Sequence, residues 1–119
     1  MKSVLLRYGN KIEAVIANND AMAIGAVEAL QKYGYNKGNK SMYIPVVGVD
    51  ALPEARDLIK KGFITGTVIQ DPREEAEAIY LIGQNLVASN SPLSGTKYKF
   101  DETGRIVRIP YYEFKDNLT

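Results

Sequence analysis

The chain has 119 residues and nearly balanced charge, with 15 Lys and Arg against 14 Asp and Glu. This length suits one small domain with its own core, and the balanced charge, without a Lys/Arg block, disfavours nucleic acid as a partner. Cys and His are both absent, which excludes disulfides, thiolate nucleophiles, the usual zinc sites and any serine or cysteine mechanism with an imidazole base.

The start of the chain gives no sign of a targeting segment. Its first apolar run, residues 4–6, is too short for the core of a signal peptide, so we expect the chain to carry none. No window approaches the roughly 20 apolar residues that a membrane span needs.

The first predicted elements are helix, strand and helix. Residues 2–8 suit the end of a helix that Gly9 and Asn10 terminate, since both tolerate the left-handed conformation. The apolar run 12–17 is predicted to be a buried strand. A helix is predicted over 20–34, where apolar side chains recur at helical spacing.

The strand-then-helix unit follows twice more. Residues 43–49 are predicted as a strand, followed by a helix that ends at Gly62. Residues 63–69 are predicted as the next strand, and Asp71 as the N-cap of a helix over 72–89. Three such units in a row predict an α/β fold, a three-layer Rossmann-like arrangement with helices on the faces of a parallel sheet.

The C-terminal part breaks this rhythm. Residues 96–114 alternate apolar and polar side chains on both sides of a turn at 101–104, which predicts a C-terminal hairpin.

Polar side chains follow each of the three predicted strands. Asn19 and Asp20 follow the first, Asp50 the second, and Gln70 with Asp71 the third. The carboxyl ends of parallel strands meet at one sheet edge, so these side chains are expected to converge. Carboxylates and amides suit the adjacent hydroxyls of a sugar. The alternative is that they cap helices, which we favour for Asp20 and Asp71, whereas Asn19 and Asp50 stay open between the two roles.

Two aspartates at strand ends also allow a second kind of function, the acid and base of a small glycosidase. Nucleotide binding lacks support, because neither GxGxxG nor GxxxxGK occurs. Gly48 and Gly66 are interpreted as positions of close strand packing. We favour a protein that is not an enzyme.

Four long blocks carry a more specific signal: IEAVIANNDAMAIGAVEAL, IPVVGVDALPEARDLIKKG, GTVIQDP and RIVRIPYYEF. Together they resemble the galactose/glucose-binding proteins of bacterial ABC transport and chemotaxis, in the periplasmic binding protein type 1 family. The shorter elements NDxMAxG and VGxD also resemble the effector-binding domains of LacI-type repressors, which stay an alternative.

The resemblance implies that residues 1–119 are a single domain, the C-terminal part of a periplasmic sugar-binding protein. Residues 1–69 would be units of the C-terminal lobe, residues 70–92 a helix that packs on the N-terminal lobe, and residues 93–119 the return strands. The implied function is a substrate-binding component of an ABC transporter for galactose or glucose. Such a protein binds a monosaccharide without catalysis.

The resemblance also implies particular site residues. Asn19 and Asp50 fall on family residues that bond sugar hydroxyls, and Gln70 stands where the family generally has Asn. Glu13 matches a bidentate calcium ligand of the family. The calcium loop lies outside this sequence, so the metal site is expected to be incomplete, and no other cofactor is expected.

The implied location is extracytoplasmic, in the periplasm or anchored at the cell surface, with an ABC permease and a chemoreceptor as partners. In the family, the helix corresponding to 72–89 packs on the N-terminal lobe. Its apolar face would be uncovered here, so we expect a homodimer in which this helix or the C-terminal hairpin crosses between subunits. That face consists of Ala76, Ile79, Tyr80, Ile82, Gly83, Leu86 and Val87.

Overall fold

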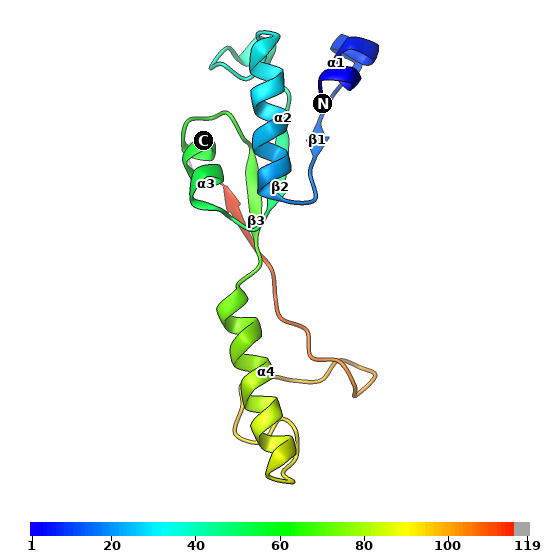
Figure 1. Ribbon diagram of the computed structural model, residues 1–119, viewed down its shortest axis with the longest axis vertical. Helices are drawn as coiled ribbons and strands as arrows, with labels where there is room; N and C mark the ends of the chain where they lie inside the picture. Colours follow the sequence, from blue (N-terminus) through cyan, green and yellow to red (C-terminus); the bar gives the residue numbers. More distant parts are fainter. Residues whose placement is uncertain (116–119) are drawn as a thin grey trace. The chain divides into compact units, whose positions relative to one another are not determined.

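The computed structural model describes residues 1–115 of the chain. The chain separates into two compact units. The first runs from Met1 to Gln70 and includes the strand that begins at Tyr112, and the second runs from Asp71 to Tyr111. Figure 1 shows the helices and strands of each unit.

The first unit is built on a four-stranded sheet with the strand order β1-β2-β3-β4. Strands β1 to β3 run parallel, and β4 pairs antiparallel with β3. The α/β class with a largely parallel sheet is therefore confirmed. The strands are β1 (Val15–Ile16), β2 (Val46–Val49), β3 (Gly66–Ile69) and β4 (Tyr112–Lys115), each shorter than the sequence predicts.

The helices of this unit begin and end near the predicted positions. Helix α1 ends at Gly9, whose positive φ of 51° suits glycine. The elements are α1 (Lys2–Tyr8), the 3₁₀ turn η1 (Gly9–Lys11), α2 (Asp20–Lys32), the 3₁₀ turn η2 (Lys40–Met42) and α3 (Pro53–Lys60).

Helices α2 and α3 contribute to one core on the same face of the sheet. Val46 on that face is fully buried against Leu30 of α2 and Ile59 of α3, whereas Ile16 on the opposite face is 85% exposed. Among the residues that the structure describes, the first unit thus forms two of the three predicted layers. The opposite face carries apolar residues on the parallel strands, such as Ile16 and Val47, and an ion pair between Glu113 and Lys115 on β4.

The predicted C-terminal hairpin is reduced to a single antiparallel bridge between Phe100 and Val107. The turn within it forms as expected, with the Gly104 amide donating to the Asp101 carbonyl at 2.9 Å. The second half of the segment continues into β4 and pairs with β3 instead. An alternating pattern predicts a strand but does not specify which strand it pairs with. The open edge of β3 offers backbone hydrogen-bonding groups just as a hairpin partner would.

The second unit is a helix with its following segment tied back onto it. Helix α4 (Pro72–Val87) begins with Asp71 as N-cap, whose side chain accepts from the Arg73 amide at 2.9 Å. This confirms the predicted cap. Later in the chain, the buried Tyr98 donates its hydroxyl to the Glu74 carbonyl at 3.1 Å, and Lys97 pairs with the Glu74 carboxylate at 3.2 Å.

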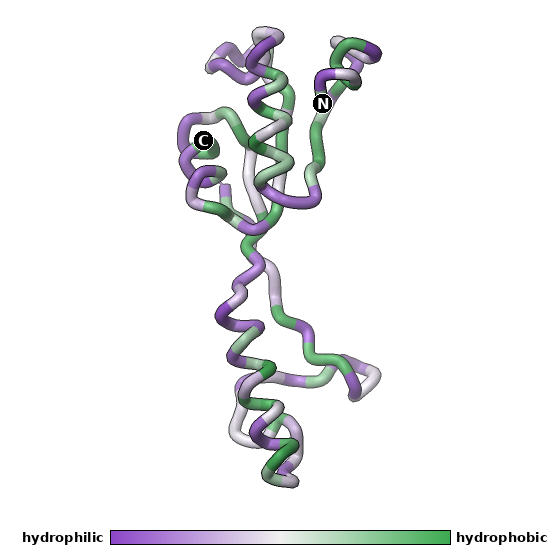
Figure 2. Tube along the Cα trace, viewed as in Figure 1, coloured by the Kyte–Doolittle hydropathy of each residue, from purple (hydrophilic) through white to green (hydrophobic). Residues whose placement is uncertain are grey.

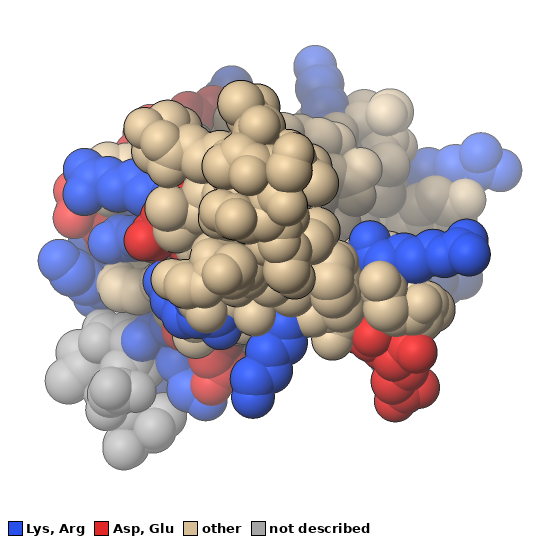
Figure 3. Space-filling view, turned by 90° about the horizontal axis from the view of Figure 1, so that it is seen from below, with Lys and Arg blue, Asp and Glu red and all other residues tan. Residues whose placement is uncertain are grey.

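The second unit also contains a segment without charge, residues 78–96. Figure 2 shows apolar residues along α4, and the nearest surface in Figure 3 is largely free of acidic and basic side chains. Ile79 is 68% exposed and Val87 is 90% exposed. Beside them lies a groove of about 400 Å³, lined by Ile82, Leu86 and Ile109 among others. No helix within residues 1–115 combines the length and the apolar character needed to cross a membrane.

Candidate functional site at the carboxyl edge of the sheet

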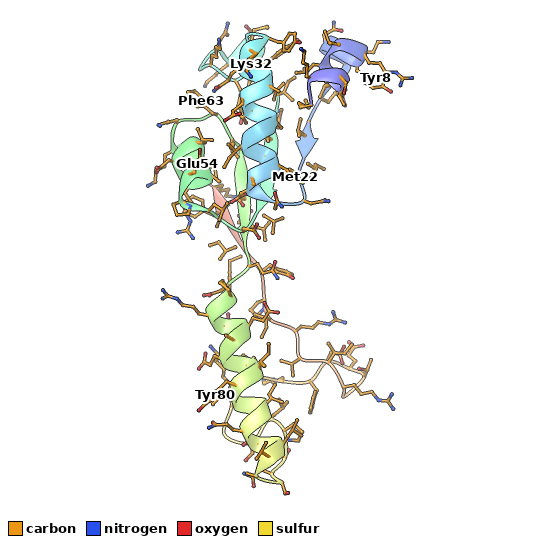
Figure 4. All side chains as sticks on the ribbon, viewed as in Figure 1. Tyr8, Met22, Lys32, Glu54, Phe63 and Tyr80 are labelled. Atoms are coloured by element: carbon orange, nitrogen blue, oxygen red, sulfur yellow. The ribbon has the colours of Figure 1, made fainter. Side chains whose placement is uncertain are left out.

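The three residues predicted to bind sugar lie where strands of the first unit end. Asn19 precedes α2, Asp50 follows β2 directly and Gln70 follows β3 directly. Because β1, β2 and β3 are parallel neighbours, their carboxyl ends share one edge of the sheet (Figure 1). In Figure 4, Met22 in the first turn of α2 and Glu54 in the first turn of α3 mark this end of the two helices.

The helix cap at this edge is Asn19 rather than Asp20. The Asn19 side-chain oxygen accepts from the Met22 amide at 2.9 Å, and its backbone is extended. Asp20 is the first residue of α2 and is completely buried. The interpretation of Asp20 as the cap is therefore wrong, because both side chains can accept the bond and the extended backbone selects Asn19. The amide nitrogen of Asn19 makes no hydrogen bond within residues 1–115 and can donate to a ligand.

Asp50 presents its side chain to solvent from an unusual backbone. Its φ is 109° and that of Ala51 is 55°, in the region that favours glycine. The Asp50 amide donates to the Val68 carbonyl at 2.8 Å, which continues the ladder between β2 and β3. The exposed carboxylate makes no hydrogen bond with the described part of the chain. Its two oxygens can therefore accept from hydroxyls of a ligand.

The β2–α3 loop, residues 50–52, is held by side chains from three other places in the first unit. The Ala51 amide donates to the Thr67 hydroxyl at 3.3 Å, and the Ala51 carbonyl accepts from Arg56 Nε at 2.8 Å. The Leu52 amide donates to Asp20 Oδ2 at 2.7 Å. Sequence reasoning assigned no role to Thr67 or Arg56, since only the fold brings them to this loop.

Gln70 and Glu13 have fewer neighbours. Gln70 is exposed and is the last residue before the chain passes into the second unit. Glu13 is exposed in the stretch before β1, and residues 1–115 contain no group of three acidic side chains that could hold a metal ion. The sugar contact of Gln70 and the calcium role of Glu13 stay predictions.

A cavity of about 620 Å³ lies away from this edge. It is lined by Tyr43, Ile64 and Thr65 among others, near the amino ends of β2 and β3. None of the three predicted sugar ligands lines it. The candidate site is thus an open edge and does not coincide with this cavity.

Comparison with known proteins agrees with this architecture. A family model described as periplasmic binding protein domain matches residues 1–91. The D-galactose/methyl-galactoside binding periplasmic protein MglB of Haemophilus influenzae is 44% identical over 110 residues, which cover 92% of this chain and 30% of that protein.

Two further relatives are more distant. The xylitol-binding protein of Mycolicibacterium smegmatis is 31% identical over 73% of this chain and 23% of its own length. The D-allose-binding periplasmic protein of Escherichia coli is 39% identical over 60% of this chain and 21% of its own length. The chain thus aligns with less than a third of each of these relatives. Because the family model matches most of its residues, the chain belongs to the periplasmic binding protein domain family.

Proposed function

We propose that the chain supplies one edge of a monosaccharide site in the substrate-binding component of a bacterial ABC importer, with galactose or glucose as the sugar. The observation that carries the proposal is the exposed Asp50 carboxylate, which makes no hydrogen bond with the described residues. It follows β2 at the carboxyl edge of a parallel sheet, and the neighbouring strand β1 leads to the Asn19 cap. The names of the relatives, which bind galactose, allose and xylitol, support a polyhydroxylated ligand.

The chemistry of the edge suits sugar hydroxyls without catalysis. Asp50 accepts hydrogen bonds from two hydroxyls, while the amide nitrogen of Asn19 donates to a hydroxyl oxygen. Gln70 both donates and accepts. Since one edge leaves most of the sugar in water, the chain alone gains little over hydration of the ligand. We therefore expect weak binding, with a dissociation constant in the millimolar range or above.

The experiment is an NMR titration of the ¹⁵N-labelled chain with D-galactose and D-glucose at high millimolar concentration. We expect saturable shifts centred on residues 19, 50 and 70, and their loss in Asp50→Ala and Asn19→Ala. Glu54→Gln, an exposed change in the neighbouring helix turn, is the matched control and leaves the shifts intact.

Two results would count against the proposal. Equal sugar-induced shifts in the unmodified chain and in both alanine variants would show that the edge does not bind sugar. Turnover of a chromogenic galactoside that is lost in Asp50→Asn would show a glycosidase instead of a binder.

For the protein of which this edge is part, we propose an extracytoplasmic location and two partners, an ABC permease and a chemoreceptor. We propose for it the division into segments that the family resemblance implies. Residues 1–69 would belong to the C-terminal lobe and residues 70–92 would form a helix that packs on the N-terminal lobe. Residues 93–119 would be the return strands, and of these 116–119 lie outside the described residues. The relatives named as periplasmic binding proteins support this location.

For the 119-residue chain itself we propose a homodimer in which a second copy covers the apolar face of α4. Ile79, Tyr80, Leu86 and Val87 on this helix are exposed apolar side chains. The absence of charge over 78–96 lets two identical faces approach without repulsion between like charges. Exposed apolar patches of this kind are typical of interaction surfaces.

A further inference from the structure

The backbone of the β2–α3 loop needs support from its surroundings. Asp50 and Ala51 both have positive φ, at 109° and 55°, although neither is glycine. Such a conformation costs free energy and persists only where neighbouring groups hold it in place. In this loop the Asp50 amide, both polar groups of the Ala51 backbone and the Leu52 amide all form hydrogen bonds.

Asp20 is the centre of that support. It is completely buried, and its two oxygens have different partners. Oδ2 accepts from the Leu52 amide at 2.7 Å, and Oδ1 accepts from the Thr67 hydroxyl at 2.6 Å. Neither bond serves its own helix. A buried carboxylate is costly unless such bonds compensate its lost hydration, so packing alone does not explain an aspartate here.

Thr67 extends the reach of Asp20 to the next residue of the loop. Its hydroxyl donates to Asp20 and at the same time accepts from the Ala51 amide at 3.3 Å. Asp20 thereby fixes Leu52 directly and Ala51 through Thr67. Gly48 of β2 provides the space, because a Cβ there would overlap Asp20 Oδ1.

Arg56 closes the loop from the other side. Its Nε donates to the Ala51 carbonyl at 2.8 Å, and its guanidinium lies over the Phe114 ring, 5.0 Å from the ring centre. The loop is thus held between α2, β3 and α3, while the exposed Asp50 carboxylate has no hydrogen-bond partner among residues 1–115. The hydrogen bonds of Thr67 and Asp20 end at Ala51 and Leu52. These residues follow Asp50, and neither bond involves Asp50 itself.

We infer that Asp20 is a positioning residue for the proposed sugar site, acting through Thr67 and Leu52 to hold the loop in the conformation that presents Asp50. The inference rests on the proposed function for its ligand. The loop conformation itself can be measured without sugar. An experiment can therefore reject the positioning role of Asp20 without rejecting sugar binding, and the reverse.

The test compares Thr67→Val, which keeps the shape but removes the hydroxyl, with Thr67→Ser, which keeps the hydroxyl. The first measurement is the three-bond HN–Hα coupling of Asp50 and Ala51 in the sugar-free chain. We expect both couplings to change in Thr67→Val and to match the unmodified chain in Thr67→Ser. The second measurement is the galactose titration, in which Thr67→Val should lose the shift at Asp50 and retain the shift at Asn19.

Unchanged couplings in Thr67→Val would overturn the positioning role whatever the sugar does. Changed couplings together with no galactose response in any variant would support the role of Asp20 and Thr67 in holding the loop and would reject the proposed function. Changed couplings with an unaltered galactose shift at Asp50 would show that these hydrogen bonds stabilise the fold and do not affect sugar binding, which overturns the inference.

If Thr67→Val fails to fold, the hydrogen bond between Leu52 and Asp20 is measured in the unmodified chain instead. A scalar coupling across the hydrogen bond between the Leu52 nitrogen and the Asp20 side-chain carbonyl carbon, with slow exchange of the Leu52 amide, is the expected result. A missing coupling with rapid exchange of that amide would overturn the inference.

Discussion

Asp101 in the turn of the second unit has a carboxyl group held in its charged form. The Thr103 hydroxyl donates to Asp101 Oδ1 at 2.6 Å and is the main cause that lowers the pKa of Asp101 below its ordinary value. The Thr103 amide, at 3.1 Å, and the Arg108 guanidinium, at 3.3 Å, act in the same direction. The turn is therefore stabilised most when Asp101 is ionised.

The sign of the pH dependence follows from this shift. A carboxyl whose pKa is lower in the folded than in the unfolded chain contributes stability above the unfolded value, about 3.9 for Asp. That contribution is lost as the pH falls through the folded pKa. Acidification should therefore loosen the turn around Asp101.

Thr103→Val should raise the pKa of Asp101 towards its ordinary value, because the hydroxyl is the largest of the groups that lower it. Arg108→Gln should raise the pKa less, since Arg108 acts on Asp101 more weakly than Thr103 does. The measurement is a ¹³C NMR titration of the Asp101 carboxyl carbon. A larger shift in Arg108→Gln than in Thr103→Val would contradict this ordering.

Glu13 gives a second prediction for a single residue. One carboxylate supplies at most two of the six to eight oxygens that calcium takes. We expect the thermal unfolding midpoint of the chain to be the same with millimolar calcium and with a chelator. Glu13→Gln serves as the comparison. A calcium-dependent rise that disappears in this variant would reveal a site that includes Glu13.

Among the elements, β2 and α2 approach each other closely at Gly48. A Cβ added to this glycine would lie 3.2 Å from the Ala23 Cβ and 3.2 Å from the Asp20 Cα, besides overlapping the Asp20 carboxylate. Gly48 is thus a position of close packing, but the close neighbours belong to helix α2 and not to another strand as the sequence analysis expected. The approach is also what brings the buried carboxylate of α2 within reach of β3.

Gly48→Ala should destabilise the chain by about 1–3 kcal/mol, the usual cost of an added methyl group in a tightly packed core. Gly25→Ala in α2 is the matched control, because a Cβ added there would meet no atom within 4 Å among the described residues. That change should instead stabilise the helix by about 0.5–1 kcal/mol. Urea unfolding followed by circular dichroism measures both, and equal effects of the two substitutions would refute the packing argument.

The helices were the elements most predictable from the sequence. Their apolar spacing, the cap at Asp71 and the glycine after α1 are local signals, so the predicted and observed limits agree closely. The strand 112–115 was expected to pair with the preceding strand of a hairpin, but it pairs with β3. An alternating pattern predicts a strand without specifying which strand it pairs with. Choice of a strand partner depends on residues distant in sequence.

The site was predictable in part for the same reason. The strand-then-helix order places Asn19, Asp50 and Gln70 at one edge without knowledge of any contact. The bond between Asp20 and Thr67 joins residues 47 positions apart, and no local pattern couples them. A buried polar network of this kind becomes visible only in three dimensions.

For the molecule as a whole, we predict that the chain is a dimer in solution. Covering apolar surface is worth about 25 cal/mol per Å², so exposed side chains along α4 together represent several kcal/mol. Ile79→Lys or Leu86→Glu should give the monomer. Leu6→Lys is the matched control, since Leu6 and Ile79 are equally exposed at 68%. Light scattering at micromolar concentration measures the mass of each variant.

A mass near 13.2 kDa for the unmodified chain, with unfolding independent of concentration, would contradict the dimer. Dissociation by Leu6→Lys as well as by Ile79→Lys would show that the interface is not specific to α4. Retention of the dimer in both α4 variants would place the interface elsewhere.

The uncharged segment 78–96 determines which protease can report on α4. Trypsin has no cleavage site between Arg73 and Lys97, because this stretch contains neither Lys nor Arg. Residues 74–97 therefore leave a tryptic digest as one peptide whether α4 is folded, covered or open. Chymotrypsin can cleave after Tyr80 and Leu86, both exposed on the helix. The rate of chymotryptic cleavage at these two residues thus measures how far a partner or a second copy protects α4.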